Sequence, residues 1–214
     1  MAQQYLHEEL YRGRSALEQL GRVKIAVCGA GALGSLLVDG LVRQGVRQLT
    51  VIDRDRVEAH NIGTQLYGQS DVGAFKAEAL RAHCFRATGV EIEAVAKTLD
   101  DRSVSKLLRG SELVIDTFDN SAARQIVTDY CREQVVACLH LGLNADYGEV
   151  RWNEGYRVPQ DVPLVDPCAY PLARNLIGLV VAVGSEVIVR YVNEGRRENY
   201  SLTLRDLKIN PESS

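Results

Sequence analysis

What this sequence of 214 residues lacks argues against several classes of protein. Its five cysteines include no C-x-x-C pair, so we expect neither a disulfide framework nor a zinc site. The net charge of −3 gives no basic surface for nucleic acid. The longest apolar stretch, Leu176 to Val192, is broken by glycines and charged residues and falls short of the roughly eighteen residues of a membrane span. The N-terminus lacks the apolar run of a signal peptide, so we expect a cytoplasmic protein without a membrane partner.

What is present begins with the pattern of a βαβ unit. The β-branched run from Val23 to Val27 predicts a buried parallel strand, and a helical pattern follows from Leu33 to Gln44. A second strand is predicted from Leu49 to Ile52. Ahead of this unit, leucines at helical intervals predict an N-terminal helix within residues 1–21, weakened in its middle by Gly13.

Three glycines in G-x-G-x-x-G spacing, Gly29, Gly31 and Gly34, occupy the turn between the first strand and its helix. Glycines permit a tight turn and a close approach of backbone to phosphate, and the following helix offers free N–H groups and a positive dipole end to an anion. Asp53 ends the second strand, where a carboxylate can accept hydrogen bonds from a ribose hydroxyl. The sequence therefore predicts a nucleotide-binding core.

About twenty residues without clear periodicity separate the second strand from the next predicted helix, and loops of this length are usually functional. This loop and the start of that helix carry Asp55, Asn61, Gln65 and Lys76. The carboxyl edge of the sheet, where this loop begins, is where α/β folds bind ligands. A solvated loop that binds nothing accounts for the same composition equally well.

Strands and helices continue to alternate through the rest of the chain. Helices are predicted at Lys76–Ala87, Val104–Leu108, Ala122–Glu133 and Leu172–Asn193. Strands are predicted at Val90–Val95, Glu112–Asp116, Val135–Leu141, Gly148–Asn153 and Ser201–Ile209, with an irregular crossover loop over residues 155–171 and a frayed tail over Asn210–Ser214. This order indicates one α/β domain over residues 1–214: a doubly wound, Rossmann-like, mostly parallel sheet with helices on both faces and an antiparallel extension near the C-terminus.

Two further positions carry possible chemistry. Asp119 and Asn120 lie at a junction between strand and helix, where the pair can act as an N-cap worth about 1 kcal/mol. A carboxylate there could equally bind Mg²⁺, which prefers oxygen ligands. Cys168 lies in the proline-rich crossover loop before a helix, where a thiolate is favoured, although a free thiol is the simpler interpretation.

Taken together, these motifs resemble those of the ThiF/MoeB/HesA superfamily, the adenylating enzymes related to ubiquitin-activating enzymes. The segments GAGALG, VIDRDRVEAHN, GAFKAEAL and VIDTFDN occur in the order of that family. The late segment DPCAYPLARNLIGLVVAVGSEVIVRYV is similar to its crossover loop and following helix. The resemblance covers about Leu17 to Val192 and matches a short form without zinc-binding cysteine pairs.

The resemblance implies an adenylyltransferase that uses ATP and Mg²⁺. Its protein substrate would be a small β-grasp carrier, ubiquitin-like or sulfur-carrying, whose C-terminal Gly-Gly carboxylate attacks the α-phosphate of ATP. The products would be an acyl-adenylate and pyrophosphate, and the enzyme would act as a homodimer. A lysine and a divalent cation suit this reaction because negative charge builds up on the phosphates.

The resemblance also implies roles for particular residues. The nucleotide site would consist of Gly29, Gly31, Ala32, Gly34, Asp53, Asp55, Asn61, Gln65, Lys76, Asp119 and Asn120. Within it the glycines would line the phosphate turn and Asp53 would hold the ribose. Lys76 and Asp119 would be catalytic, with Asp119 binding Mg²⁺, and Cys168 would take part in carrier thioester or acyl-disulfide chemistry.

Two departures from the family pattern leave other functions open. Where the family motif N-L-x-R-Q has an arginine, this chain has Thr64. A threonine lacks the permanent positive charge and the bidentate donors with which a guanidinium group binds phosphate. The family's N-terminal arginine, which reaches across a dimer interface, is missing from QQYLHEE, and only Arg12 and Arg14 lie nearby. A catalytically weak partner subunit or carrier-binding module is therefore one alternative. An NAD-dependent oxidoreductase is another, which the glycine motif permits but Lys76 and Asp119 do not explain.

Overall fold

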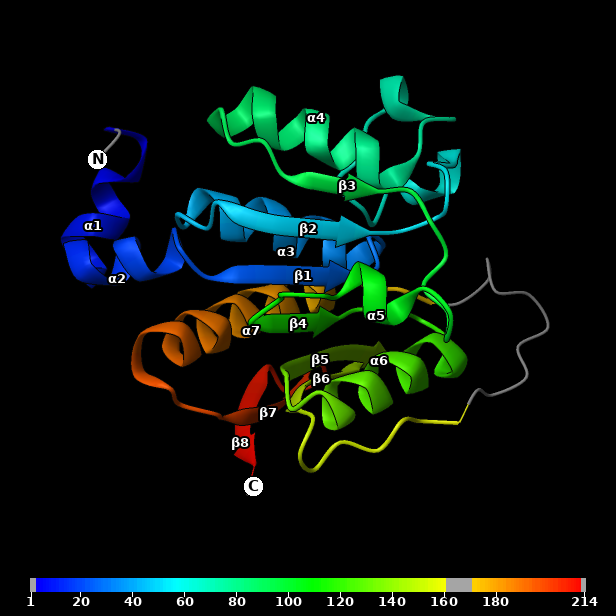
Figure 1. Cartoon of the computed structure of the whole chain (residues 1–214). Coiled ribbons are helices and arrows are strands. Elements are labelled where there is room, and N and C mark those ends of the chain that lie inside the picture. The colour runs from blue at the N-terminus through cyan, green and yellow to red at the C-terminus, as the bar shows by residue number, and fades with distance from the viewer. Residues whose placement is uncertain (1–2, 161–170, 213–214) are drawn as a thin grey trace.

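The computed structural model describes residues 3–160 and 171–212, and one eight-stranded sheet runs through this part of the chain (Figure 1). The strand order is β3-β2-β1-β4-β5-β6-β7-β8, parallel from β3 to β5 and antiparallel from β5 to β8. The strands are β1 (Lys24–Cys28), β2 (Gln48–Ile52), β3 (Glu93–Val95), β4 (Leu113–Asp116), β5 (Ala137–Asn144), β6 (Tyr147–Trp152), β7 (Asn199–Thr203) and β8 (Lys208–Glu212).

Helices cover both faces of this sheet, which confirms the predicted doubly wound fold. Residues of α3, α4 and α7 pack in one hydrophobic cluster, and residues of α5 and α6 pack in a second cluster on the other face. The α-helices are α1 (Leu6–Arg12), α2 (Arg14–Leu20), α3 (Ala32–Arg43), α4 (Lys76–Thr88), α5 (Val104–Leu107), α6 (Ser121–Glu133) and α7 (Arg174–Glu194). Short 3₁₀ helices lie at Gln3–Tyr5, Ala59–Asn61 and Gln69–Asp71.

The first strand shows why the apolar run predicted a central parallel strand. Ile25 and Val27 of β1 belong to the cluster of α3 and α7, whereas Ala26 and Cys28 belong to the cluster of α6. Successive side chains of a strand point to opposite faces, so a strand that is covered on both faces needs apolar residues at every position. The sequence pattern and the burial therefore agree residue by residue.

The prediction of a single N-terminal helix is wrong, because the structure has two helices there. Two seven-residue helices, α1 and α2, meet at Gly13, whose φ is +85°. A left-handed residue cannot belong to a right-handed helix, so the chain turns at this glycine. The leucine spacing indicated the helical character of both segments, and only the break went unrecognised.

The C-terminal prediction of one strand and a frayed tail is also wrong. Residues 199–212 form a hairpin of β7 and β8, with Leu207 at a φ of +53° in the turn. Asn210 to Glu212, expected to be frayed, pair with β7. The turn contains neither glycine nor proline, and the alternation of apolar and polar residues continues across it. The sequence therefore predicted one continuous strand instead of two strands and a turn. The strand predicted from Val90 begins instead at Glu93.

The long helix α7 is, by length and composition alone, apolar enough to cross a membrane. Half of that apolar stretch is buried inside the protein, where α7 contacts β5, β6 and α3. Two glycines allow α7 to pack closely on the sheet. A Cβ at Gly184 of α7 would lie 2.7 Å from Leu141 of β5, and one at Gly148 of β6 would lie 2.3 Å from Val180 of α7. In this fold the apolar composition serves a core helix.

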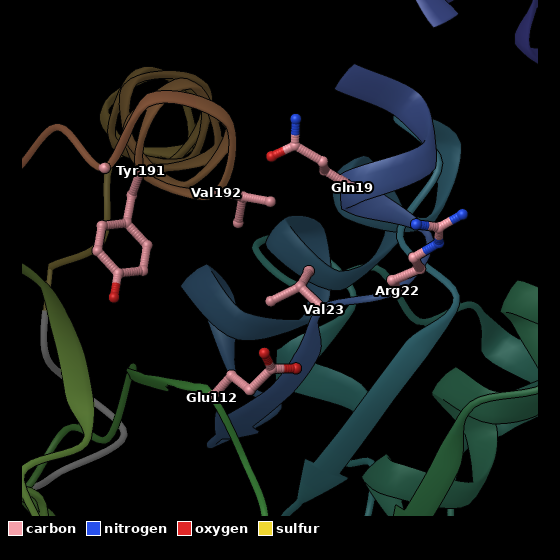
Figure 2. A pocket seen from close by; sticks show the side chains of 7 residues that line it. Gln19, Arg22, Val23, Glu112, Tyr191 and Val192 are labelled. Carbon is pink, nitrogen blue, oxygen red and sulfur yellow. The ribbon is translucent and has the colours of Figure 1, made fainter. Parts of the chain in front are cut away.

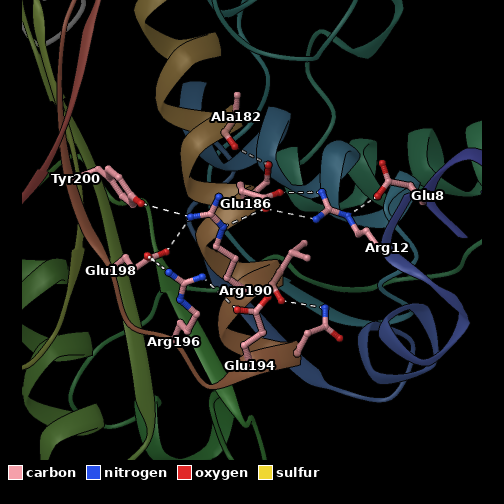
Figure 3. A network of polar contacts seen from close by, with 12 residues as sticks. Glu8, Arg12, Ala182, Glu186, Arg190, Glu194, Arg196, Glu198 and Tyr200 are labelled. Carbon is pink, nitrogen blue, oxygen red and sulfur yellow. Dashed lines mark hydrogen bonds and ion pairs between the residues drawn. The ribbon is translucent and has the colours of Figure 1, made fainter. Parts of the chain in front are cut away.

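Ion pairs join α1 to α7 and continue from α7 to Glu198, directly before β7 (Figure 3). Arg12 lies 2.6 Å from Glu8 and 2.8 Å from Glu186, and its side chain is 13% exposed. Arg190 of α7 in turn pairs with Glu186 and with Glu198. Arg12 is therefore engaged with carboxylates of its own chain rather than projecting toward another molecule.

We predict that two glycines of α3 respond in opposite ways to alanine. A Cβ at Gly34 would lie 2.0 Å from the Gly29 carbonyl oxygen, so Gly34→Ala should lower the free energy of unfolding by about 3 kcal/mol or more. At Gly40 a Cβ meets no atom within 4 Å, so Gly40→Ala should raise it by up to about 1 kcal/mol. Urea denaturation measures both; equal effects of the two substitutions would contradict this packing.

Candidate nucleotide-binding site

The order of the strands places the candidate site between β1 and β4. From β1 the chain winds to β2 on one side, and its later part continues from β4 on the other side. Ligands of doubly wound folds bind at the carboxyl ends of the strands beside such a switch point. Thr117, directly after β4, closes this point: its N–H donates to the Cys28 carbonyl at 2.9 Å, and its hydroxyl lies 3.0 Å from the Gly29 carbonyl. No motif in the sequence singles out Thr117.

The glycine turn after β1 has the geometry of a phosphate-binding loop. Gly29 has a φ of +99°, and its N–H donates to the Ile52 carbonyl at 2.9 Å. A Cβ at Gly31 would meet no atom of residues 3–160 and 171–212 within 4 Å, so the backbone there is open toward this part of the protein. Helix α3 begins at Ala32 without a capping side chain, so its first N–H groups remain available to an anion.

Asp53 holds the glycine turn in place. One carboxylate oxygen accepts from the Ala30 N–H at 2.7 Å, and the other accepts from the Asp55 N–H at 2.7 Å. Burial raises the pKa of Asp53, and these backbone hydrogen bonds and the charge of Lys76 only partly oppose it. A carboxylate has about four acceptor positions, so the two bonds leave capacity for a ribose hydroxyl.

Lys76 lies beside the glycine turn at the start of α4. Its side chain is 11% exposed, and its Nζ is 3.7 Å from a carboxylate oxygen of Asp55. The hydroxyl of Tyr67 lies 2.7 Å from the Ala30 carbonyl and 3.3 Å from the Lys76 carbonyl, which joins the two segments. The fold thus brings a buried ammonium group to the carboxyl edge, as the sequence predicted.

The segment from Asn61 to Leu66 packs against the first turn of α3. Asn61 is 5% exposed, and its side-chain oxygen accepts from the Glu58 N–H at 2.9 Å. The Leu66 N–H donates to Ser35 Oγ at 3.1 Å. Gln65 has a buried Oε1 without a hydrogen-bond partner among the described residues. Asn61 and Gln65 therefore lie at the predicted edge, and their contact with a nucleotide stays a prediction.

The structure confirms the N-cap interpretation of the Asp119–Asn120 pair, whereas Mg²⁺ binding by Asp119 stays a prediction. Asn120 is the N-cap of α6 and accepts from the Ala123 N–H at 2.9 Å. Asp119 is exposed, with one oxygen 3.4 Å from the side-chain nitrogen of Asn120. Within residues 3–160 and 171–212, no group of three His, Cys, Asp or Glu side chains is placed to hold a metal. Because Mg²⁺ is commonly held by one or two carboxylates plus substrate phosphates, the exposed Asp119 fits such a shared site. Cys168 lies outside the described residues.

A buried charged cluster lies directly beneath this turn, and the sequence did not predict it. Asp116, at the end of β4, has one oxygen 2.8 Å from His140 Nδ1 and 3.4 Å from Arg124 Nη1, and all three side chains are buried. Burial opposes ionisation of Asp116, but Arg124 and His140 outweigh it and lower the pKa of this carboxyl. The Phe118 N–H donates to the other Asp116 oxygen at 3.0 Å, so the cluster fixes the turn that carries Asp119.

Hydrogen bonds at both ring nitrogens hold His140 within this cluster. The Asn153 side-chain nitrogen donates to the Thr128 carbonyl, which turns the Asn153 oxygen toward His140 Nε2 at 2.9 Å. With Asp116 at Nδ1, each ring nitrogen of His140 faces a side-chain oxygen of a neighbouring residue. Tyr156 stacks on the ring with centroids 3.8 Å apart. The partners come from β4, β5, α6 and residues 153–156, too far apart in sequence for any local pattern to join them.

A surface hollow of about 430 Å³ lies at the opposite edge of the sheet (Figure 2). It is lined by the C-terminal parts of α2 and α7 and the approaches to β1 and β4, including Gln19, Glu112 and Tyr191. The amino ends of the parallel strands meet there, whereas the glycine turn follows their carboxyl ends. This hollow is therefore separate from the candidate nucleotide site.

A glycine turn at the switch point of a doubly wound sheet defines a protein of the Rossmann-like class, in which this edge is the usual place for a ligand. The chain belongs to the ThiF family, whose model matches residues 2–171.

The chain is similar to two curated proteins with known activities. It is 34% identical over 119 residues to the SAMP-activating enzyme E1 of Haloferax volcanii, covering 55% of this chain and 44% of that protein. It is 29% identical over 154 residues to the sulfur carrier protein ThiS adenylyltransferase of Bacillus subtilis, covering 69% and 46%. This chain thus spans about half the length of these relatives.

A solved structure confirms the fold at low sequence identity. The crystal structure of E. coli MccB with ATP superposes with a TM-score of 0.82 and 15% identity, covering 100% of this chain and 72% of that one. At this identity the likeness establishes the architecture alone.

We predict that Asp116→Asn destabilises the protein in a pH-dependent manner. At neutral pH it removes the carboxylate that faces the buried Arg124 guanidinium, which should cost about 3 kcal/mol. The pKa of Asp116 is lowered in the folded state, so its contribution to stability is present above the ordinary value of 3.8 and is lost as pH falls through the lower folded value. The difference from wild type should therefore shrink below about pH 4.

Urea denaturation between pH 3 and 7 measures this difference, with Asp129→Asn on the exposed side of α6 as the matched control. The control should change the free energy of unfolding by less than about 0.5 kcal/mol. A loss for Asp116→Asn that stays constant over the whole pH range would contradict an ionised Asp116 in the cluster.

Proposed function

We propose that this chain catalyses the ATP-dependent adenylation of the C-terminal glycine of a small β-grasp carrier protein, either ubiquitin-like or sulfur-carrying. The observation that supports this most is the convergence of the glycine turn, Lys76 and Asp119 at one edge of a ThiF-family sheet. The names of the relatives agree, since one activates SAMP and another adenylates the sulfur carrier ThiS.

In the proposed reaction, a carboxylate oxygen of the carrier attacks the α-phosphorus of ATP. The bond between that phosphorus and the bridging oxygen of pyrophosphate breaks, which leaves an acyl-adenylate and pyrophosphate. The open backbone at Gly31 and the free N–H groups of α3 would hold the phosphates. Lys76 would stabilise the negative charge that develops on the phosphate oxygens, in a buried place where such an interaction is strong.

Asp119 is the residue that would hold Mg²⁺ at this site. Its carboxylate is exposed, and its turn is fixed from below through the hydrogen bond between Phe118 and Asp116. Bound Mg²⁺ would neutralise charge on the departing pyrophosphate. Asn120 serves as the cap that starts α6 and thereby orients the same turn.

Three further expectations stay predictions. Cys168 as the site of a covalent carrier intermediate lies outside the described residues. A homodimer and a cytoplasmic location are expected from the resemblance and from the N-terminal sequence. The family's N-terminal arginine is absent from this chain, and Arg12 is the arginine nearest in sequence to its expected place. Arg12 forms ion pairs with Glu8 and Glu186 of its own chain. We therefore do not assign Arg12 to the active site of a second copy.

We predict that the chain supports ATP–pyrophosphate exchange that depends on a carrier ending in Gly-Gly. Lys76→Gln and Asp119→Asn should each reduce the exchange rate by about a hundredfold, because each removes a charge that stabilises the transition state. Lys106→Gln on α5 and Asp129→Asn on α6, both exposed, are the matched controls and should leave the rate unchanged.

Exchange that persists in Lys76→Gln and Asp119→Asn would contradict the assigned roles. Absence of exchange, with ATP binding intact in a direct titration, would contradict the enzyme and favour a partner subunit that holds the carrier. Binding of NAD without binding of ATP would contradict both and favour an oxidoreductase.

A further inference from the structure

Arg174 is an exposed guanidinium group at the carboxyl edge of the sheet that none of the roles above uses. It is the first residue of α7, and its Nη1 lies 3.3 Å from the Gly63 carbonyl oxygen. Figure 1 shows that α7 begins on the side toward which β1 and β2 point. This partner is a neutral carbonyl, so the hydrogen bond itself supplies no counter-charge to Arg174.

The segment that Arg174 contacts is tied to the glycine turn. The Leu66 N–H donates to Ser35 in the first turn of α3, and the Tyr67 hydroxyl lies 2.7 Å from the Ala30 carbonyl. Gly63 precedes both bonds by only a few residues. The contact between Arg174 and Gly63 therefore brings a cation, distant in sequence, to the neighbourhood of the phosphate turn.

Two other cations at this edge share a single carboxylate, that of Asp55. Lys76 Nζ and Arg54 Nε each lie 3.7 Å from a carboxylate oxygen of Asp55. A triphosphate carries several negative charges, and one ammonium group shared with a carboxylate offsets few of them. An exposed guanidinium with planar, bidentate donors suits the remaining phosphate oxygens.

We infer that Arg174 binds the phosphate groups of the nucleotide and supplies from α7 the permanent charge that Thr64 does not provide. This inference rests on the proposed use of ATP. Thr64 directly follows Gly63, the residue that Arg174 contacts. An arginine at position 64 and the arginine at position 174 would therefore place their charge near the same segment. The role of Arg174 is contact with the β- and γ-phosphates, which AMP lacks.

Calorimetric titration of the whole chain with ATP and with AMP tests this role in wild type, Arg174→Gln and the matched control Arg205→Gln. Glutamine keeps a donor for the Gly63 carbonyl but removes the charge, and both arginines are exposed. Arg174→Gln should weaken ATP binding by about tenfold while AMP binding changes by less than about twofold. Arg205, in the turn between β7 and β8, should affect neither ligand.

A rescue variant separates charge from structure. Thr64→Arg combined with Arg174→Gln should restore ATP affinity to within about threefold of wild type, and Arg174→Lys should fall between wild type and Arg174→Gln. ATP affinity unchanged in Arg174→Gln, or an equal loss for AMP, would overturn the inference and leave the proposed function standing. A wild type that does not bind ATP would overturn the proposed function and this inference together.

Discussion

The close approach of three backbone segments at the switch point is the constraint on which this structure depends. Gly34 of α3 lies so near to Gly29 that a Cβ would come within 2.0 Å of its carbonyl oxygen, and within 2.6 Å of Thr117 Oγ1. This packing fixes where α3 starts relative to β1 and β4. The open backbone at Gly31 and the uncapped N–H groups of α3 follow from it, and these are the features that suit a phosphate group.

Two carboxylates, one after β2 and one at the end of β4, hold the backbone turns at this edge of the sheet. Asp53 binds the Ala30 N–H and holds the glycine turn from β2, while Asp116 binds the Phe118 N–H and holds the next turn from β4. The two carboxyls differ in their surroundings: burial raises the pKa of Asp53, whereas Arg124 and His140 overcome burial and lower the pKa of Asp116. The edge is thus built from fixed backbone turns, which leaves Asp119 exposed for a ligand.

The parts of this arrangement that depend on neighbouring residues could be predicted from the sequence. The spacing of the glycines and the acid that ends β2 indicated the turn, and apolar runs indicated the central strands. The break at Gly13 and the turn at Leu207 were missed because each depends on the φ of one residue in an otherwise regular pattern. The cluster of Asp116 and His140 could not be found, because its partners meet only after the sheet and α6 have assembled.

Direct titration of nucleotides against wild type and Gly31→Ala tests the central claim, that this turn binds the phosphates of ATP. No atom of the described residues lies within 4 Å of a Cβ at Gly31, so the substitution should leave thermal stability unchanged while blocking the approach of pyrophosphate. The account predicts that wild type binds ATP and that Gly31→Ala weakens this binding by at least about tenfold. Unchanged ATP binding in Gly31→Ala, or binding of NAD alone, would contradict it.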